Sequence, residues 1–234
     1  MLTLVANVIV VNMNPTRRAP TVATPKAGYH HGDLARALVD AATQLVERAG
    51  PSALTLREAA RLAGVSVAAP YRHFADRDAL LAAVLTEGFD ELAQGTDDAR
   101  ETALAEAGAL AALRAVGLAY VQFAARRPSI YRLMFGPECD KAAHPGLMAA
   151  GHRALGVLVQ AVRDAQAAGQ VRPAPPEMVA LAGWSLCHGL ASLHTDGLLA
   201  SSLSVPVEQA AGWLVDMLLV GAAQPPAPQP QRGR

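Results

Sequence analysis

The chain has 234 residues, of which 52% are hydrophobic, and its 20 basic residues balance its 20 acidic ones. This length allows two domains, and the zero net charge argues against nonspecific electrostatic binding of nucleic acid by the whole protein. Two cysteines are too few for a disulfide framework, which fits a cytoplasmic protein.

Residues 1–27 are expected to form a disordered N-terminal arm. The opening run MLTLVANVIVV is too short to span a membrane and no basic residue precedes it, so no leader is predicted. We infer either that translation starts at Met13 or that this run is disordered. Arg17, Arg18 and Lys26 could contact the backbone or minor groove of DNA, or serve as a solubilising tail.

Residues 28–75 predict a compact unit of three helices. The first is expected over residues 33–49, with an Asp as its cap and a Gly-Pro pair at its end. Thr55 then caps a helix of about two turns, a turn containing glycine follows, and Ser66 caps the next helix. This layout is typical of a helix-turn-helix, whose second helix enters the major groove of DNA. An ordinary helical bundle with similar turns is the alternative.

The side chains of this unit suggest how it would contact DNA. The first turns after Thr55 and Ser66 suit phosphate, and small residues after Ser66 allow close approach to thymine methyl groups. Tyr71 and His73 could reach phosphates or bases, and Arg72 could contact guanine bidentately. For each arginine the alternative is a solvated surface charge. The predicted DNA-binding residues are Thr55, Arg57, Ser66, Val67, Ala68, Ala69, Pro70, Tyr71, Arg72, His73 and Arg77.

Charge is unevenly distributed along the chain. Residues 16–77 contain nine Lys and Arg against five acidic residues, a balance of +4, so the remainder carries −4. Affinity for a polyanion is therefore concentrated in the N-terminal third.

The rest of the chain predicts helices throughout. A connecting helix is expected over residues 76–95, and residues 96–222 show breaks at prolines and glycines but no strand periodicity and no repeat. The uncharged run 178–195 includes Trp, Ser, His and Gly, which suits a buried helix better than a membrane span. Residues 223–234 are disordered by composition. The predicted fold class is all-α, with an N-terminal helix-turn-helix domain and a C-terminal helical domain.

Three stretches resemble a known family. GDLARALVDAATQLVERAG and TLREAARLAGVSVAAPYRHFADRDALL, with their spacing, are similar to the N-terminal domain of TetR/AcrR-type one-component transcriptional regulators. Trp184, His188 and Gly189 match the Trp-x-x-x-His-Gly signature of one subgroup's C-terminal domain. The resemblance covers about residues 28–221. It implies a homodimer that binds operator DNA, usually as a repressor, under the control of a small ligand.

The last two expected helices, about residues 176–199 and 206–221, carry apolar stripes and glycines. We expect them to form a four-helix bundle with a second copy, as the resemblance also implies. Two recognition helices would then read a pseudo-palindrome. Alternatively, both helices only close the core of one chain. The predicted interface comprises Val179, Ala182, Gly183, Leu186, Val207, Ala210, Leu214, Met217 and Leu218.

A cavity for a small, mostly apolar effector is expected in the C-terminal domain, and its occupant would shift the connecting helix. For His188, a core pair with Trp184 is favoured over contact with the ligand. The predicted pocket residues are Tyr120, Phe123, Tyr131, Met134, Phe135, Trp184 and His188.

Other classes of function find less support. The chain has no G-x-S-x-G, G-x-x-x-x-G-K or G-x-G-x-x-G motif, so no enzyme, catalytic residue or cofactor is predicted. Its cysteines and histidines lack the i, i+4 or C-x-x-C spacing of metal ligands, so no metal site is predicted. Control by a partner protein, or by redox chemistry at Cys139 and Cys187, remains an alternative to a small ligand.

Overall fold

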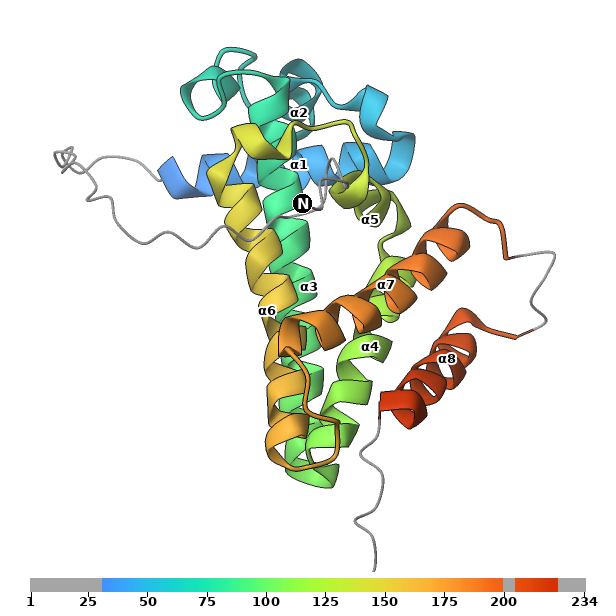
Figure 1. Cartoon of the computed structure of the whole chain (residues 1–234). Coiled ribbons are helices and arrows are strands. Elements are labelled where there is room, and N and C mark those ends of the chain that lie inside the picture. The colour runs from blue at the N-terminus through green and yellow to red at the C-terminus, as the bar shows by residue number, and fades with distance from the viewer. Residues whose placement is uncertain (1–30, 200–204, 223–234) are drawn as a thin grey trace, which may run out of the picture.

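A computed structural model describes residues 31–199 and 205–222, and over these residues the chain is helical, as predicted (Figure 1). The expected N-terminal arm and C-terminal tail lie outside the described residues. None of the described helices is long and apolar enough to cross a membrane. The α-helices are α1 (His31–Ala49), α2 (Leu56–Leu62), α3 (Arg77–Ala107), α4 (Ala109–Arg126), α5 (Pro128–Phe135), α6 (Pro145–Ala167), α7 (Pro176–Thr195) and α8 (Val207–Ala222).

The N-terminal unit consists of α1, α2 and the start of α3, joined by short turns. It packs around fully buried apolar side chains that include Leu38, Val46, Leu54 and Leu81. Helix α1 begins at His31, before the expected Asp33 cap, and ends where Gly50 adopts a φ of 78°. A left-handed glycine at this position stops the helix, because L side chains rarely adopt that conformation.

Helix α3 links this unit to the body, and it is longer than the predicted connecting helix over residues 76–95. It has 31 residues, which at about 1.5 Å per residue makes it about 46 Å long. Gly95 lies inside the helix on an exposed face, where glycine is tolerated. The helix ends at Gly108, whose φ is 87°. The unit therefore sits at the upper end of one continuous rod (Figure 1).

Helices α4, α5 and α6 pack against the other part of α3. Helices α5, α6 and α7 each begin at a proline, Pro128, Pro145 and Pro176. These breaks were predicted, because proline is favoured in the first helical turn and excluded further in. Helices α4 and α6 pack along α3, while α7 and α8 pack on α4, with α8 at the lower right of Figure 1.

Candidate DNA-binding surface and ligand cavity

Side chains cap the first helix of the motif, as predicted at Thr55, and also the connecting helix, at Asp76. Thr55 Oγ1 accepts a hydrogen bond from the Glu58 N–H at 3.1 Å, and Asp76 Oδ1 accepts one from Ala79 N–H at 2.8 Å. Each side chain thus pairs one of the backbone donors left free at a helix start.

The second helix of the motif differs from the prediction. Instead of an α-helix from Ser66, the chain makes a turn followed by a 3-10 helix over Pro70–Arg72. Proline at position 70 has no N–H to donate to the Ser66 carbonyl, which accepts from the Ala69 N–H at 3.0 Å instead. The segment is therefore wound more tightly than an α-helix.

Five side chains of this segment point to solvent. We call Ser66, Val67, Ala68, Tyr71 and Arg72 the reading face, since all are exposed. Tyr71 keeps 61% of its surface accessible and Val67 keeps 53%, although neither is a residue type that normally favours solvent.

Several predicted contacts lie elsewhere. Pro70 is buried in the unit, so its assignment as a DNA contact is corrected to a core role, while Ala69 and His73 are half-buried. Thr55, which caps the first helix of the motif, and Arg57, which lies in that helix, are both exposed. Arg77, expected to contact phosphate, instead donates through Nε to the Leu54 carbonyl at 2.9 Å and through Nη2 to the Pro51 carbonyl at 2.8 Å.

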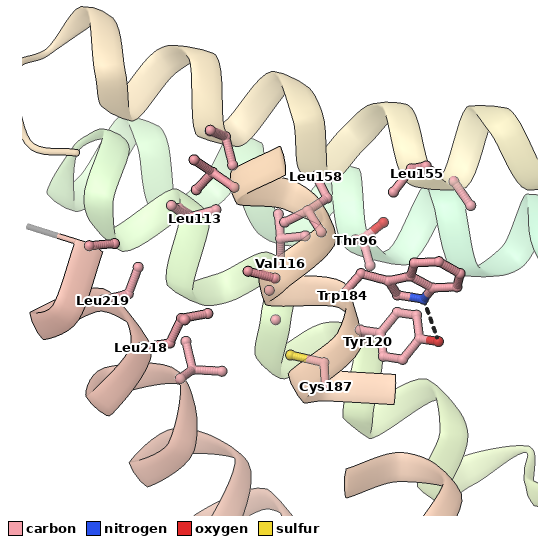
Figure 2. Close-up of a pocket in the computed structure, with 18 of the residues that line it drawn as sticks. Thr96, Leu113, Val116, Tyr120, Leu155, Leu158, Trp184, Cys187, Leu218 and Leu219 are labelled. Carbon is pink, nitrogen blue, oxygen red and sulfur yellow. Dashed lines mark hydrogen bonds between the residues drawn. The ribbon is translucent and has the colours of Figure 1, made fainter. Parts of the chain in front are cut away.

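The body contains a cavity of about 550 Å³, lined by residues of α3, α4, α6, α7 and α8 together with Phe135 (Figure 2). Of the predicted pocket residues, Tyr120, Phe135 and Trp184 line it. Phe123, Tyr131, Met134 and His188 do not, which corrects the prediction. Phe123, Tyr131 and Met134 are buried in the core instead, since an aromatic or flexible apolar side chain suits either place.

The cavity-lining residues on α3 and α6 were not predicted from the sequence. Phe89, Leu92 and Thr96 follow one another at helical spacing along α3, and Leu155 and Leu158 face them from α6. That spacing on α3 was the available signal. Arg172 is the charged residue among the described lining residues. The cavity is therefore suited to a mostly apolar molecule.

Two of the lining residues, Tyr120 and Trp184, belong to a polar cluster that also includes Tyr131 and His188. The Trp184 indole N–H donates to the Tyr120 hydroxyl at 3.2 Å, and that hydroxyl lies 3.0 Å from His188 Nδ1. The Tyr131 hydroxyl lies 2.7 Å from the same nitrogen. Burial raises the pKa of Tyr120 well above its usual value and the pKa of Tyr131 to about 12, and lowers the pKa of His188. The cluster therefore holds uncharged groups at neutral pH.

An exposed apolar face covers α7 and α8, but it differs from the predicted interface. Met178, Leu181, Trp213, Met217 and Val220 are exposed by 60%, 43%, 65%, 57% and 77%, respectively. We call these five residues the apolar face. Several large apolar side chains exposed on two helices that pack together are typical of an interaction site.

The predicted interface was wrong at Val207 and Ala210, which are buried inside the chain. Val179, Ala182, Gly183 and Leu218 line the cavity, and Leu186 and Leu214 are half-buried. Met217 is the predicted interface residue that also belongs to the apolar face, and it lines the cavity as well. Helix α8 is apolar on most sides, so its periodicity did not distinguish the inner face from the outer one. The orientation is set in part by Asp216, whose Oδ2 accepts from Arg114 Nη2 at 3.0 Å.

Both cysteines are buried and free. Burial raises the pKa of each thiol to about 11. A protonated, buried thiol reacts slowly with oxidants, because the thiolate is the reactive form.

Two sequence models of one family match the chain. The model described as "Bacterial regulatory proteins, tetR family" matches residues 38–84, and "Tetracyclin repressor-like, C-terminal domain" matches residues 113–218. Among curated proteins, none matches this chain.

Solved structures share the fold. A protein of unknown function from Rhodococcus sp. RHA1 is 37% identical, with a TM-score of 0.71 over 85% of this chain and 100% of its own. The TetR family transcriptional regulator PfmR from Thermus thermophilus is 20% identical, with a TM-score of 0.56 over 78% and 97% of the two chains. A TetR family transcription regulator from Marinobacter aquaeolei is 20% identical, with a TM-score of 0.59 over 82% and 96%.

The N-terminal helix-turn-helix and the helical body together define a transcription factor rather than an enzyme. The chain belongs to the TetR family of transcriptional regulators, as both sequence models show. Membership in the subgroup with the Trp184-x-x-x-His188-Gly189 signature remains a prediction.

Proposed function

We propose that the protein is a homodimeric, ligand-responsive transcriptional repressor that binds a pseudo-palindromic operator in double-stranded DNA. The observation that carries this proposal is the continuity of α3, which begins directly after the reading face and lines the cavity with Phe89, Leu92 and Thr96. One rigid element thus joins a DNA-binding surface to a ligand-sized space.

The geometry of α3 supports coupling between the two sites. Phe89 lies twelve residues beyond Arg77, which corresponds to about 18 Å along the helix axis. A ligand that tilts α3 at the cavity would move the reading face at its end. It can do so only if it binds the two arrangements with different affinity, typically by about 1–3 kcal/mol.

The apolar face supports the homodimer. The five side chains lie on the two last helices, which pack on α4 and leave these residues uncovered within the chain. A second copy brings the same face to meet it, because a two-fold interface is self-complementary. The reading faces of the two copies would then lie on one side of a DNA duplex, at a separation set by the dimer.

The effector is expected to be small and mostly apolar. A cavity of about 550 Å³ lies in the usual range of about 300–1,000 Å³ for ligand pockets. The uncharged cluster at Tyr120 and Trp184 offers hydrogen bonding without a fixed charge. Repression is proposed because it is the usual activity of the family.

Two other forms of control are less well supported. Redox control would need a reactive thiol, whereas both cysteines are buried with raised pKa values. Control by a different protein would also use the apolar face, but this form of control does not explain why the body contains a ligand-sized cavity.

The test is selection of bound duplexes from a random pool by the purified protein, with Tyr71→Ala in parallel. The wild type is expected to enrich a sequence with two-fold symmetry and Tyr71→Ala to lose it. The matched control is Arg163→Ala. The Arg163 side chain is exposed on α6, pairs with Glu177 and is distant in sequence from the reading face. Enrichment of an unsymmetrical sequence, or equal enrichment by Tyr71→Ala, would contradict the proposal.

Dimerisation is tested by sedimentation equilibrium. Trp213→Ala together with Met217→Ala is expected to dissociate the dimer, because it removes the two largest side chains of α8 from the apolar face. Val159→Ala on α6 provides a partly buried apolar control. A variant that remains dimeric would show that the two copies meet elsewhere, and a monomeric wild type would point to a different partner.

A further inference from the structure

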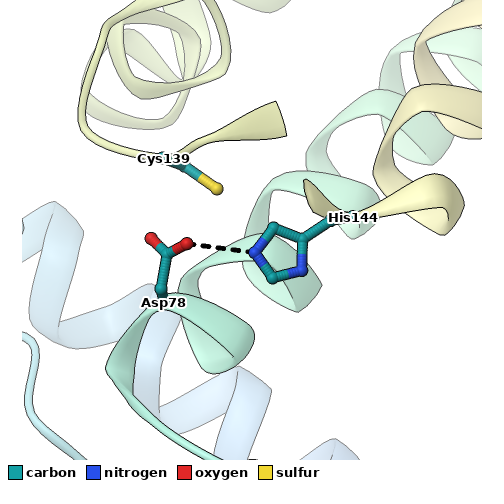
Figure 3. Close-up of side chains that lie close together, drawn as sticks. All are labelled: Asp78, Cys139 and His144. Carbon is teal, nitrogen blue, oxygen red and sulfur yellow. Dashed lines mark hydrogen bonds and ion pairs between the residues drawn. The ribbon is translucent and has the colours of Figure 1, made fainter. Parts of the chain in front are cut away.

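Three side chains with metal-binding atoms converge where the DNA-binding unit meets the body. Asp78, Cys139 and His144 each offer one ligand atom, and these atoms all lie within 4.8 Å of one another. Figure 3 shows the three side chains pointing toward a common space. The cluster lies outside the cavity and outside the reading face, and neither uses it.

The fold positions each member. Asp78 lies in the first turn of α3, two residues after the Asp76 cap. Cys139 is in the loop after α5, and His144 immediately precedes Pro145, the first residue of α6. Cys139 and His144 are 61 and 66 positions away from Asp78 in sequence, so no spacing of all three residues could have indicated the site.

The contacts within the cluster are already those of a partly assembled site. His144 Nε2 lies 3.0 Å from Asp78 Oδ2, and their side chains are 24% and 41% exposed. Cys139 is 5% exposed, and its sulfur lies within 4.8 Å of a carboxylate oxygen of Asp78. The sulfur is therefore buried close to the carboxylate, while the other two groups remain accessible to an ion from solvent.

We propose that Asp78, Cys139 and His144 bind a divalent transition metal ion of the zinc class. Thiolate and imidazole favour such ions, whereas calcium and magnesium prefer oxygen ligands alone. A thiolate and a carboxylate together carry the charge that neutralises a divalent cation, and imidazole binds as a neutral ligand.

The separations suit this ion after small side-chain rotations. Zinc bonds of about 2.0–2.3 Å in a tetrahedron place neighbouring ligand atoms about 3.5 Å apart. The Asp78–His144 contact is already shorter than that spacing, and Cys139 is within the 4.8 Å limit of the cluster. Three protein ligands leave a fourth position for water or for another small ligand.

The bound ion would join the start of α3 to the α5–α6 connection. The reading face ends at Arg72, six residues before Asp78, so the ion would hold the DNA-binding unit at a fixed angle to the body. It would thus act at a different place from the apolar effector. This inference does not depend on the proposed repressor function.

The experiment is a titration of the metal-free full chain with Co²⁺, followed by ultraviolet and visible absorption. A thiolate-to-cobalt band is expected to saturate at an equimolar amount of Co²⁺ and to disappear when Zn²⁺ displaces it. Cys139→Ser should abolish the band, and His144→Ala should weaken binding at least about tenfold, the loss that even outer-shell changes produce. Zn²⁺ should raise the melting temperature of the wild type but not that of Cys139→Ser.

Cys187→Ser is the matched control, because Cys187 is also buried and free but lies on α7. The band should survive in this variant and in the double variant His30→Ala, His31→Ala, which removes the histidine pair of the N-terminal sequence. Asp78→Asn provides a second test that keeps the cysteine, and it should weaken Co²⁺ binding. No saturable band, or a band that persists in Cys139→Ser, would overturn the proposal.

Discussion

Arg77, the first residue of α3, holds the backbone of Leu54, which lies 23 residues earlier, through an Nε-to-carbonyl hydrogen bond of 2.9 Å. A second bond joins its Nη2 to the carbonyl of Pro51. The arginine therefore links α3 to the turn between α1 and α2. If a ligand moves α3 as proposed, this link connects that motion to the helix-turn-helix in addition to the chain itself.

Arg77→Ala is expected to lower the free energy of unfolding by about 1.5–3 kcal/mol, the usual net value of a hydrogen bond to a charged group. Urea denaturation followed by circular dichroism measures it. Arg61→Ala is the control, because the Arg61 side chain is 70% exposed and pairs with Glu58 on the same helix. Equal stabilities of the two variants would refute this structural role for Arg77.

Arg72→Ala is expected to weaken binding to the selected operator by about 1–3 kcal/mol and to relax the preference at one base pair. Arg72 is exposed on the reading face and could contact guanine through both guanidinium nitrogens. Fluorescence anisotropy with single-base operator variants measures both effects. If binding weakens equally on every operator variant, and the slope of log affinity against log salt concentration falls by about one, Arg72 contacts a phosphate instead. Unchanged affinity would remove it from the interface.

Gly88 and Gly95 provide a matched pair on α3. A Cβ at Gly88 would lie 2.9 Å from Ile130 Cγ2 and 3.1 Å from Met134 Sδ, whereas one at Gly95 would meet nothing within 4 Å. Both substitutions gain the same helix propensity, so Gly88→Ala should be less stable than Gly95→Ala by about 1–3 kcal/mol, the usual cost of overpacking. Urea titrations of the two variants give the difference directly. A difference near zero would mean that α5 can move away from α3 at little cost.

His188 should make stability depend on pH. Burial lowers the pKa of His188 in the folded chain, below its ordinary value of 6.5. As the pH falls through 6.5, the unfolded chain takes up a proton before the folded chain does, so the folded state loses stability until the lowered pKa is reached. The melting temperature of the wild type should therefore exceed that of His188→Asn by less as the pH is lowered from about 8 to about 5. His152→Asn, at an exposed position, is the control. A constant difference would show that His188 does not contribute in this way.

Local signals predicted much of the fold. The cap at Thr55, the glycine after α1 and the prolines that begin later helices all act within one turn of chain. Such features depend on neighbouring residues, so the sequence displays them directly. The 3-10 helix could also have been predicted from Pro70, because its missing N–H prevents a regular α-helical hydrogen bond at this position.

Features that depend on distant packing could not be predicted in this way. The sequence could not show which side of α8 is buried, because apolar residues cover most of its circumference, and Val207 and Ala210 were assigned to the wrong side. Tyr131 and Met134 were placed in the cavity, although they fill the space between helices. The Asp78–Cys139–His144 cluster depends on contacts across more than sixty residues.

The most direct test of the central claim is an equilibrium titration that compares the selected duplex with a scrambled duplex of the same composition at physiological salt. Fluorescence anisotropy of the labelled duplexes gives both dissociation constants. A sequence-specific regulator should bind the selected duplex at least about a thousandfold more tightly, the lower end of the usual ratio. Equal affinities that fall together as salt is raised would mean that the reading face contacts only phosphates, and would contradict operator recognition.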